Sequence, residues 1–93
     1  PRQRLARLPA DPQRRLAELD AALRHALARA TAQPIERLDR DAAMAQLPEA
    51  LAEKVSETTR QLDRARFGEG AMKDVLARLE AAVKALVDEL ERA

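Results

Sequence analysis

The chain has 93 residues, enough for one domain with a single hydrophobic core, and its lack of cysteine excludes disulfides and thiolate metal sites. Its 17 basic and 16 acidic residues give a formal net charge of +1 and are interspersed, which argues against nucleic-acid binding. The longest wholly apolar run, residues 42–45, is too short to span a bilayer. These features predict a single soluble domain over residues 1–93.

Residues 1–11 are expected to form a solvated lead-in. The first eight of them, PRQRLARL, are basic and carry Leu5 and Leu8 on one face, so residues 1–8 could alternatively lie beside an anionic membrane. Because the sequence begins with Pro1 rather than Met, either an initiator Met has been removed or the sequence is a piece of a longer protein.

The first helix is predicted over residues 12–32. Asp11 is a favourable N-cap residue, and Pro12 suits the first helical position. Apolar residues then recur at three- and four-residue steps, namely Leu16, Leu19, Leu23, Ala26, Leu27 and Ala30. Pro34 interrupts the pattern because proline removes a backbone donor and restricts the residue before it.

Two further helices are predicted over residues 35–46 and 48–67. The apolar face of the shorter one consists of Ile35, Leu38, Ala42 and Ala45. The buried stripe of the longer one consists of Leu51, Val55, Thr58, Leu62 and Ala65. Gly68 is expected to end this helix as a left-handed C-cap, and residues 68–70 to form a tight turn, since they lack the Lys-Ser/Thr of a phosphate-binding loop.

The last helix, predicted over residues 71–92, has the most regular apolar pattern. Its stripe consists of Met72, Leu76, Leu79, Val83, Leu86 and Leu90, widened by Val75, Ala82 and Val87. Opposite charges lie four residues apart on its outer side, in the pairs Asp74–Arg78, Glu80–Lys84 and Asp88–Arg92. With short connections and no strand pattern, the sequence predicts an all-α fold, an antiparallel bundle of three long helices plus one short helix.

His25, the only histidine, is the one residue that suggests group transfer. Histidine phosphotransfer domains are similar in size and helix content, and their reactive histidine is followed by Leu two positions on, then by a basic residue and a Gly-containing helical turn. Here Leu27 keeps the Leu, but the basic residue is displaced to Arg29 and the glycine is missing. Helical spacing places His25 toward solvent, which favours an ordinary surface histidine. A phosphotransfer signalling domain that uses His25 is the alternative function.

The carboxylates and hydroxyls show no other catalytic pattern. Glu49, Glu53 and Glu57 form a row at four-residue steps, but a divalent ion would need further oxygen ligands close by, so this row is interpreted as a solvated helix face. No general base stands at a recognisable spacing from Thr58, which is expected to be half-buried and to bond its own helix backbone. The chain is therefore not expected to be an enzyme or to hold a metal or cofactor.

The run LDRARFG at residues 62–68, followed by a Leu-rich helix, resembles the cytosolic helical tail of bacterial inner-membrane proteins of the BatD and membrane transglutaminase-like kind. In those tails a helix ends in a Leu-x-x-Ala-x-aromatic-Gly turn. The resemblance covers residues 47–86 and departs from the pattern at Phe67, where tyrosine is more usual, and in the missing tryptophan. It implies a cytoplasmic location at the inner face of the plasma membrane, residues 1–8 as a juxtamembrane stretch, and association with MoxR-type ATPases and von Willebrand A proteins.

The function expected from the sequence is a non-catalytic protein–protein interaction or assembly module. The apolar stripe of the last helix is wider than packing in a bundle of three long helices needs. Apolar faces that stay exposed after folding mark partner surfaces. The candidate residues for binding a protein partner or a second copy are Leu76, Leu79, Val83, Leu86 and Leu90, with Arg66 and Phe67 at the rim. Nucleic acid is not expected as a partner, because Asp11, Glu18 and Asp20 are interspersed among the arginines of the first helix.

Overall fold

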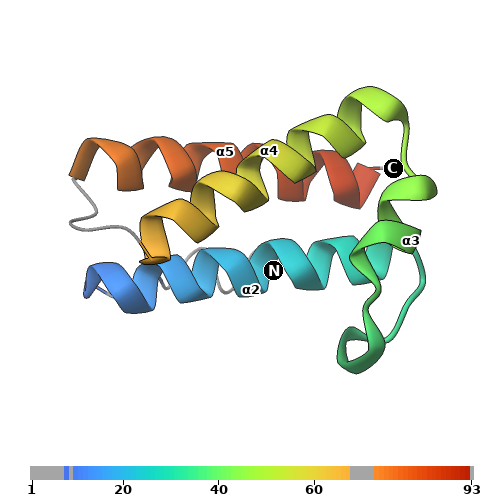
Figure 1. Ribbon diagram of the computed structural model, residues 1–93, viewed down its shortest axis with the longest axis horizontal. Helices are drawn as coiled ribbons and strands as arrows, with labels where there is room; N and C mark the ends of the chain where they lie inside the picture. Colours follow the sequence, from blue (N-terminus) through green and yellow to red (C-terminus); the bar gives the residue numbers. More distant parts are fainter. Residues whose placement is uncertain (1–7, 9, 68–72, 93) are drawn as a thin grey trace.

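Three long helices form an antiparallel bundle (Figure 1). They are α2 (Pro12–Ala30), α4 (Glu49–Phe67) and α5 (Lys73–Arg92). The 3-10 turn η1 (Ile35–Arg37) and the short helix α3 (Arg40–Ala45) connect α2 to α4 at one end of the bundle. The sequence prediction of an all-α bundle of three long helices and one short helix is thereby confirmed.

The computed structural model describes residue 8 and residues 10–67 and 73–92, without the side chains of Phe67 and Lys73. No strand occurs in this part of the chain. The predicted cap at Gly68, the turn at residues 68–70, most of the lead-in, and Met72 lie outside the described residues. Among the helices of the described part, none is both long and apolar enough to cross a membrane.

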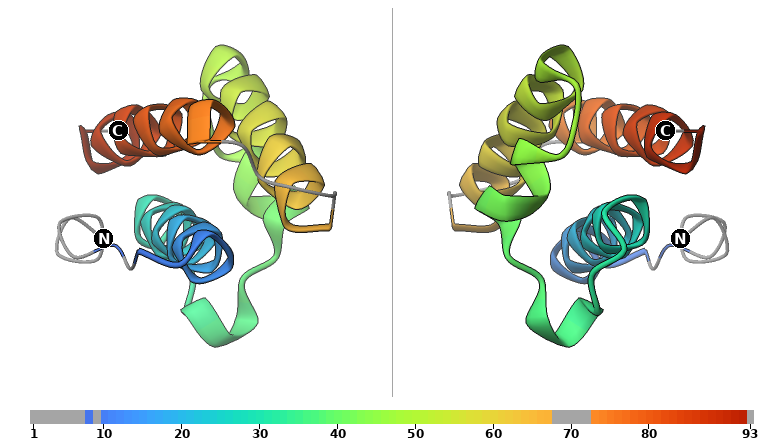
Figure 2. Two further views of the ribbon diagram at one scale, coloured as in Figure 1. Left: turned by 90° about the vertical axis from the view of Figure 1, so that its left-hand side faces the viewer. Right: turned by 90° about the vertical axis from the view of Figure 1, so that its right-hand side faces the viewer.

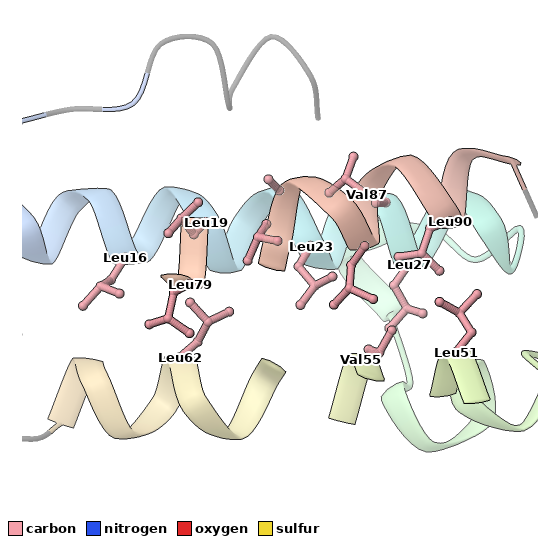
Figure 3. Close-up of a cluster of buried hydrophobic side chains, with 14 of the residues drawn as sticks. Leu16, Leu19, Leu23, Leu27, Leu51, Val55, Leu62, Leu79, Val87 and Leu90 are labelled. Atoms are coloured by element: carbon pink, nitrogen blue, oxygen red, sulfur yellow. The ribbon is translucent and has the colours of Figure 1, made fainter. Parts of the chain in front are cut away.

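The core is one cluster of aliphatic side chains between the three long helices, which surround it on three sides (Figures 2 and 3). Helix α2 packs against both other long helices and supplies Leu16 and Leu19, which are completely buried. The stripe predicted for α4 is buried too, including Thr58, except that Ala65 is only partly buried against the core. Since removing apolar surface from water stabilises a fold by about 25 cal/mol per Å², this cluster is the main source of stability.

Helix α2 starts at the predicted residue but ends earlier than predicted. Asp11 occupies the N-cap position without a side-chain capping bond, and its backbone carbonyl accepts from the Arg15 amide at 2.8 Å. At the other end, Ala32 has a positive φ of 54°. The amides of Gln33 and Ala32 donate to the carbonyls of Ala28 and Arg29 at 2.9 and 3.3 Å. These two bonds make a Schellman motif, with alanine where glycine is usual.

The helix predicted over residues 35–46 is wrong as a single element. The chain is extended at Leu38 and Asp39, which separate η1 from α3. Asp39 acts as the N-cap of α3, where its Oδ1 accepts from the amides of Asp41 and Ala42 at 3.1 and 3.2 Å. Aspartate favours such local bonds over a helix interior, and the break therefore falls before it.

This break also changes which residues of the segment are buried. Of the four residues predicted as its apolar face, Ile35 and Leu38 are half-buried, but Ala42 and Ala45 are exposed. Ala43 is completely buried in their place, and Met44 packs against the core. Because the segment does not continue as one helix, its faces do not keep the predicted 3.6-residue period.

Candidate functional site

The five aliphatic residues of α5 predicted to face a partner lie in the core instead. Each of them is at most 8% exposed, namely Leu76, Leu79, Val83, Leu86 and Leu90. Helix α5 packs against two helices, α2 and α4, which bury these five residues and Val87, whereas Val75 of the predicted stripe stays 39% exposed. The expectation that these leucines remain as an exposed surface is therefore wrong.

The two predicted rim residues have separate outcomes. Arg66 is half-buried, and its Nη1 lies 3.6 Å from Oδ2 of Asp20. It therefore belongs to an ion-pair network within the bundle. The side chain of Phe67 lies outside the described part of the structure, so its predicted role stays a prediction.

Asp20 is a buried carboxylate that joins three helices. It is 6% exposed on α2, and its Oδ1 lies 3.7 Å from Nη2 of Arg40 on α3. Arg66 of α4 approaches its other oxygen. The sequence contained a signal for this burial, because Asp20 falls four residues after Leu16 and three before Leu23 on the apolar stripe. The burial of Asp20 is nevertheless not among the sequence predictions.

A different surface is hollowed: the side of the bundle where α4 and α5 meet. An open groove of about 640 Å³ runs between these helices. Its apolar lining consists of Ala50 from α4 and Ala82, Ala85 and Leu86 from α5. Three of these four side chains are single methyl groups, which leave space that longer side chains would fill. The groove is thus a consequence of small residues on both facing helices.

Charged side chains line the same groove. Glu53, Glu57 and Glu89 contribute three carboxylates, and Lys54 contributes one ammonium, which gives the lining a formal charge of −2. Lys54 Nζ lies 3.3 Å from Oε1 of Glu89, so this pair connects α4 to α5. The row of glutamates predicted to be a solvated face therefore includes two residues that border a concave surface.

Glu57 is held in place by two neighbours on its own helix. Its Oε1 accepts from Nε2 of Gln61 at 3.1 Å, and its Oε2 lies 2.9 Å from Nη2 of Arg60. Gln61 also lines the groove, whereas Arg60 does not. These contacts orient the Glu57 carboxylate while both partners remain exposed to solvent.

A second ion-pair network joins α5 to α2. Arg15 Nη2 lies 2.7 Å from Oε2 of Glu80, and Lys84 Nζ lies 3.1 Å from Oε1. The predicted Glu80–Lys84 pair is thus confirmed. The hydrogen bond from Arg15, assisted by Lys84 and opposed by partial burial, holds the pKa of the Glu80 carboxyl below its ordinary value of 4.5.

His25 is the residue on which the alternative function of phosphotransfer depends. His25 is half-buried on α2 rather than turned fully to solvent, and it does not line the groove. Within the described residues, no cluster of three or more His, Cys, Asp or Glu side chains could hold a metal ion. Phosphotransfer by His25 stays a prediction.

No protein-family model, curated protein or solved structure matches this chain.

Proposed function

We propose that the chain is a protein–protein interaction module without catalytic activity of its own and that it binds its partner through the α4/α5 groove. The observation that carries this proposal is the concave surface of about 640 Å³ with a methyl-rich lining and a border of carboxylates. Concave apolar surfaces with a polar rim are typical of sites that receive a helix or peptide.

The groove replaces the leucine face of α5 as the binding surface. Leu86 contributes its edge to the lining while remaining in the core. A partner would consequently contact the outer flank of α5 and the facing flank of α4 without opening the bundle. The location at the cytoplasmic face of a bacterial membrane, which the resemblance of residues 62–68 implies, is part of the same proposal.

A groove-filled variant, Ala50→Gln/Ala85→Gln, tests the proposal. Both alanines line the groove and are exposed, so longer neutral side chains should occupy the groove without disturbing the core. The matched control is Ala17→Gln/Ala77→Gln, at exposed helical positions outside the groove. Circular dichroism would establish that both variants remain folded.

The measurement is selection of helical peptides from a display library on the wild-type chain, with light scattering to detect self-association. We expect the groove-filled variant to bind the selected peptides, or a second copy of itself, roughly tenfold or more weakly than the wild type, because a few central contacts supply most of the binding energy. The control should bind as tightly as the wild type. The proposal is wrong if binding is absent or is equally strong in both variants.

A further inference from the structure

The length and openness of the groove favour a rod-shaped occupant over a small molecule. Its α4 side extends from Ala50 to Gln61, which is about 16 Å or three helical turns. Its α5 side extends from Ala82 to Glu89, about two turns. Small-molecule sites usually enclose most of their ligand, whereas this groove is open along its length.

The apolar lining favours close approach by another helix. Ala50, Ala82 and Ala85 present methyl groups on the two sides of the groove, and Leu86 lies beneath them at 3% exposure. The distance between packed helices depends on the size of the side chains at the contact, so alanines permit a short one. An amphipathic helix with apolar residues at i, i+3, i+4 and i+7 matches such a lining.

The charge of the lining selects between possible helices. The single ammonium, on Lys54, already lies 3.3 Å from Glu89. A partner with acidic flanks would bring like charges against Glu53 and Glu57, whereas lysine or arginine flanks would be attracted to them. Both glutamates are exposed, so their field reaches an approaching partner and weakens with salt.

We infer that the occupant of the α4/α5 groove is a basic amphipathic helix of about three turns from another protein. Its apolar stripe rests on the alanines of α4 and α5. Its lysines or arginines pair with Glu53 and share Glu57 and Glu89 with the basic neighbours that these two already have, Arg60 and Lys54. This inference rests on the proposed function and specifies the chemistry of its partner.

Two synthetic helical peptides test the inference. They share one Ala/Leu stripe and differ only on the flanks, which carry lysine in one and glutamate in the other. Titration is followed by amide chemical shifts and by fluorescence anisotropy at low and high salt. We expect the lysine peptide to bind at least about tenfold more tightly, with a difference that shrinks as salt rises, and its shifts to map to the groove.

Charge-neutralised variants locate the effect. In Glu53→Gln/Glu57→Gln the lysine peptide should bind several-fold more weakly. The control Glu36→Gln/Asp63→Asn removes the same formal charge at exposed positions outside the groove and should bind it nearly as well as the wild type. Equal losses in both variants would show non-specific attraction and overturn the inference.

The outcomes separate this inference from the proposed function. If both peptides bind equally and both are lost in the groove-filled variant, or if the chain associates with itself through the groove, the site is real but the basic helix is wrong. If neither peptide binds, the basic helix is also wrong, and the library selection alone decides the proposed function. If the lysine peptide binds the groove-filled variant undiminished, both proposals are overturned.

Discussion

Ala32 adopts the backbone conformation that the turn after α2 requires, although this conformation is unfavourable for alanine. Its φ of 54° lies in the left-handed region, which costs an L-amino acid about 1–2 kcal/mol and glycine very little. We expect Ala32→Gly to raise the free energy of unfolding by roughly 1 kcal/mol, measured by urea denaturation. The same substitution at Ala17, exposed within α2, should lower it by about 0.5–1 kcal/mol. A loss of stability at position 32 would contradict the proposed cause.

Substituting Asp20 and substituting its two arginine partners are predicted to change stability by different amounts. The side chains of Arg40 and Arg66 are 41% and 36% exposed, so they can turn to water if the carboxylate is removed. The carboxylate cannot do so, because its side chain is only 9% exposed. An unpaired buried charge is strongly destabilising, whereas replacing buried ionic groups by apolar ones is often neutral.

We therefore expect Arg40→Met/Arg66→Met to lower the free energy of unfolding by at least about 2 kcal/mol. Asp20→Leu should change it by less. Denaturant titration of the three proteins at neutral pH measures both differences. If Asp20→Leu were instead the more destabilising change, the arginines rather than the carboxylate would be the groups that depend on the ion pairs.

Between elements, the contact of Arg15 on α2 with Glu80 on α5 makes stability depend on pH. The pKa of Glu80 is lowered in the folded protein, so its contribution is present above the unfolded pKa and is lost as pH falls through the folded pKa. For a partly exposed pair we expect a coupling energy of about 0.2–1 kcal/mol. A double-mutant cycle with Arg15→Gln and Glu80→Gln, measured at neutral pH and well below pH 4.5, should show coupling only at neutral pH. Coupling that persists in acid would contradict this assignment.

The two N-cap aspartates offer a matched comparison. Asp39 accepts two backbone bonds at the start of α3, whereas the Asp11 side chain makes none at the start of α2. We expect Asp39→Ala to cost about 1 kcal/mol of unfolding free energy. Asp11→Ala should cost less, because only its interaction with the helix dipole is lost. Thermal unfolding of both variants checks the difference, and equal losses would show that the two cap bonds contribute little.

The spacing of apolar residues was sufficient to predict the three long helices but insufficient to predict the structure of residues 35–46. In α2, α4 and α5 many turns repeat the same pattern, so one misplaced residue does not change the result. In a segment of 12 residues, the capping bonds of Asp39 outweighed the apolar pattern. The Asp39 amide also donates to Oε1 of Gln33, six residues earlier, at 3.1 Å, a contact that the apolar spacing does not encode.

For the whole molecule, the sequence predicted the core better than the surface. Leu76 and Val83 were recognised as strongly apolar, but their neighbours could not be known until the positions of α2 and α4 were known. The groove depends on Ala50 of α4 and Ala85 of α5 lining one concave surface between two helices. Such a juxtaposition is a property of packing, whereas periodicity within one helix reports only on that helix.

Helix α2 makes the other two long helices interdependent, because it packs against both and supplies the completely buried Leu16 and Leu19. A fragment of residues 47–93 should therefore lack a cooperative thermal transition. Adding a peptide of residues 8–34 should restore one by complementation, which calorimetry of the mixture would detect. Cooperative unfolding of the fragment alone would contradict this.

Residues 47–86 span α4 and most of α5 but leave out α2, against which both helices pack. Any protein that borrowed only this hairpin would have to supply its own substitute for α2.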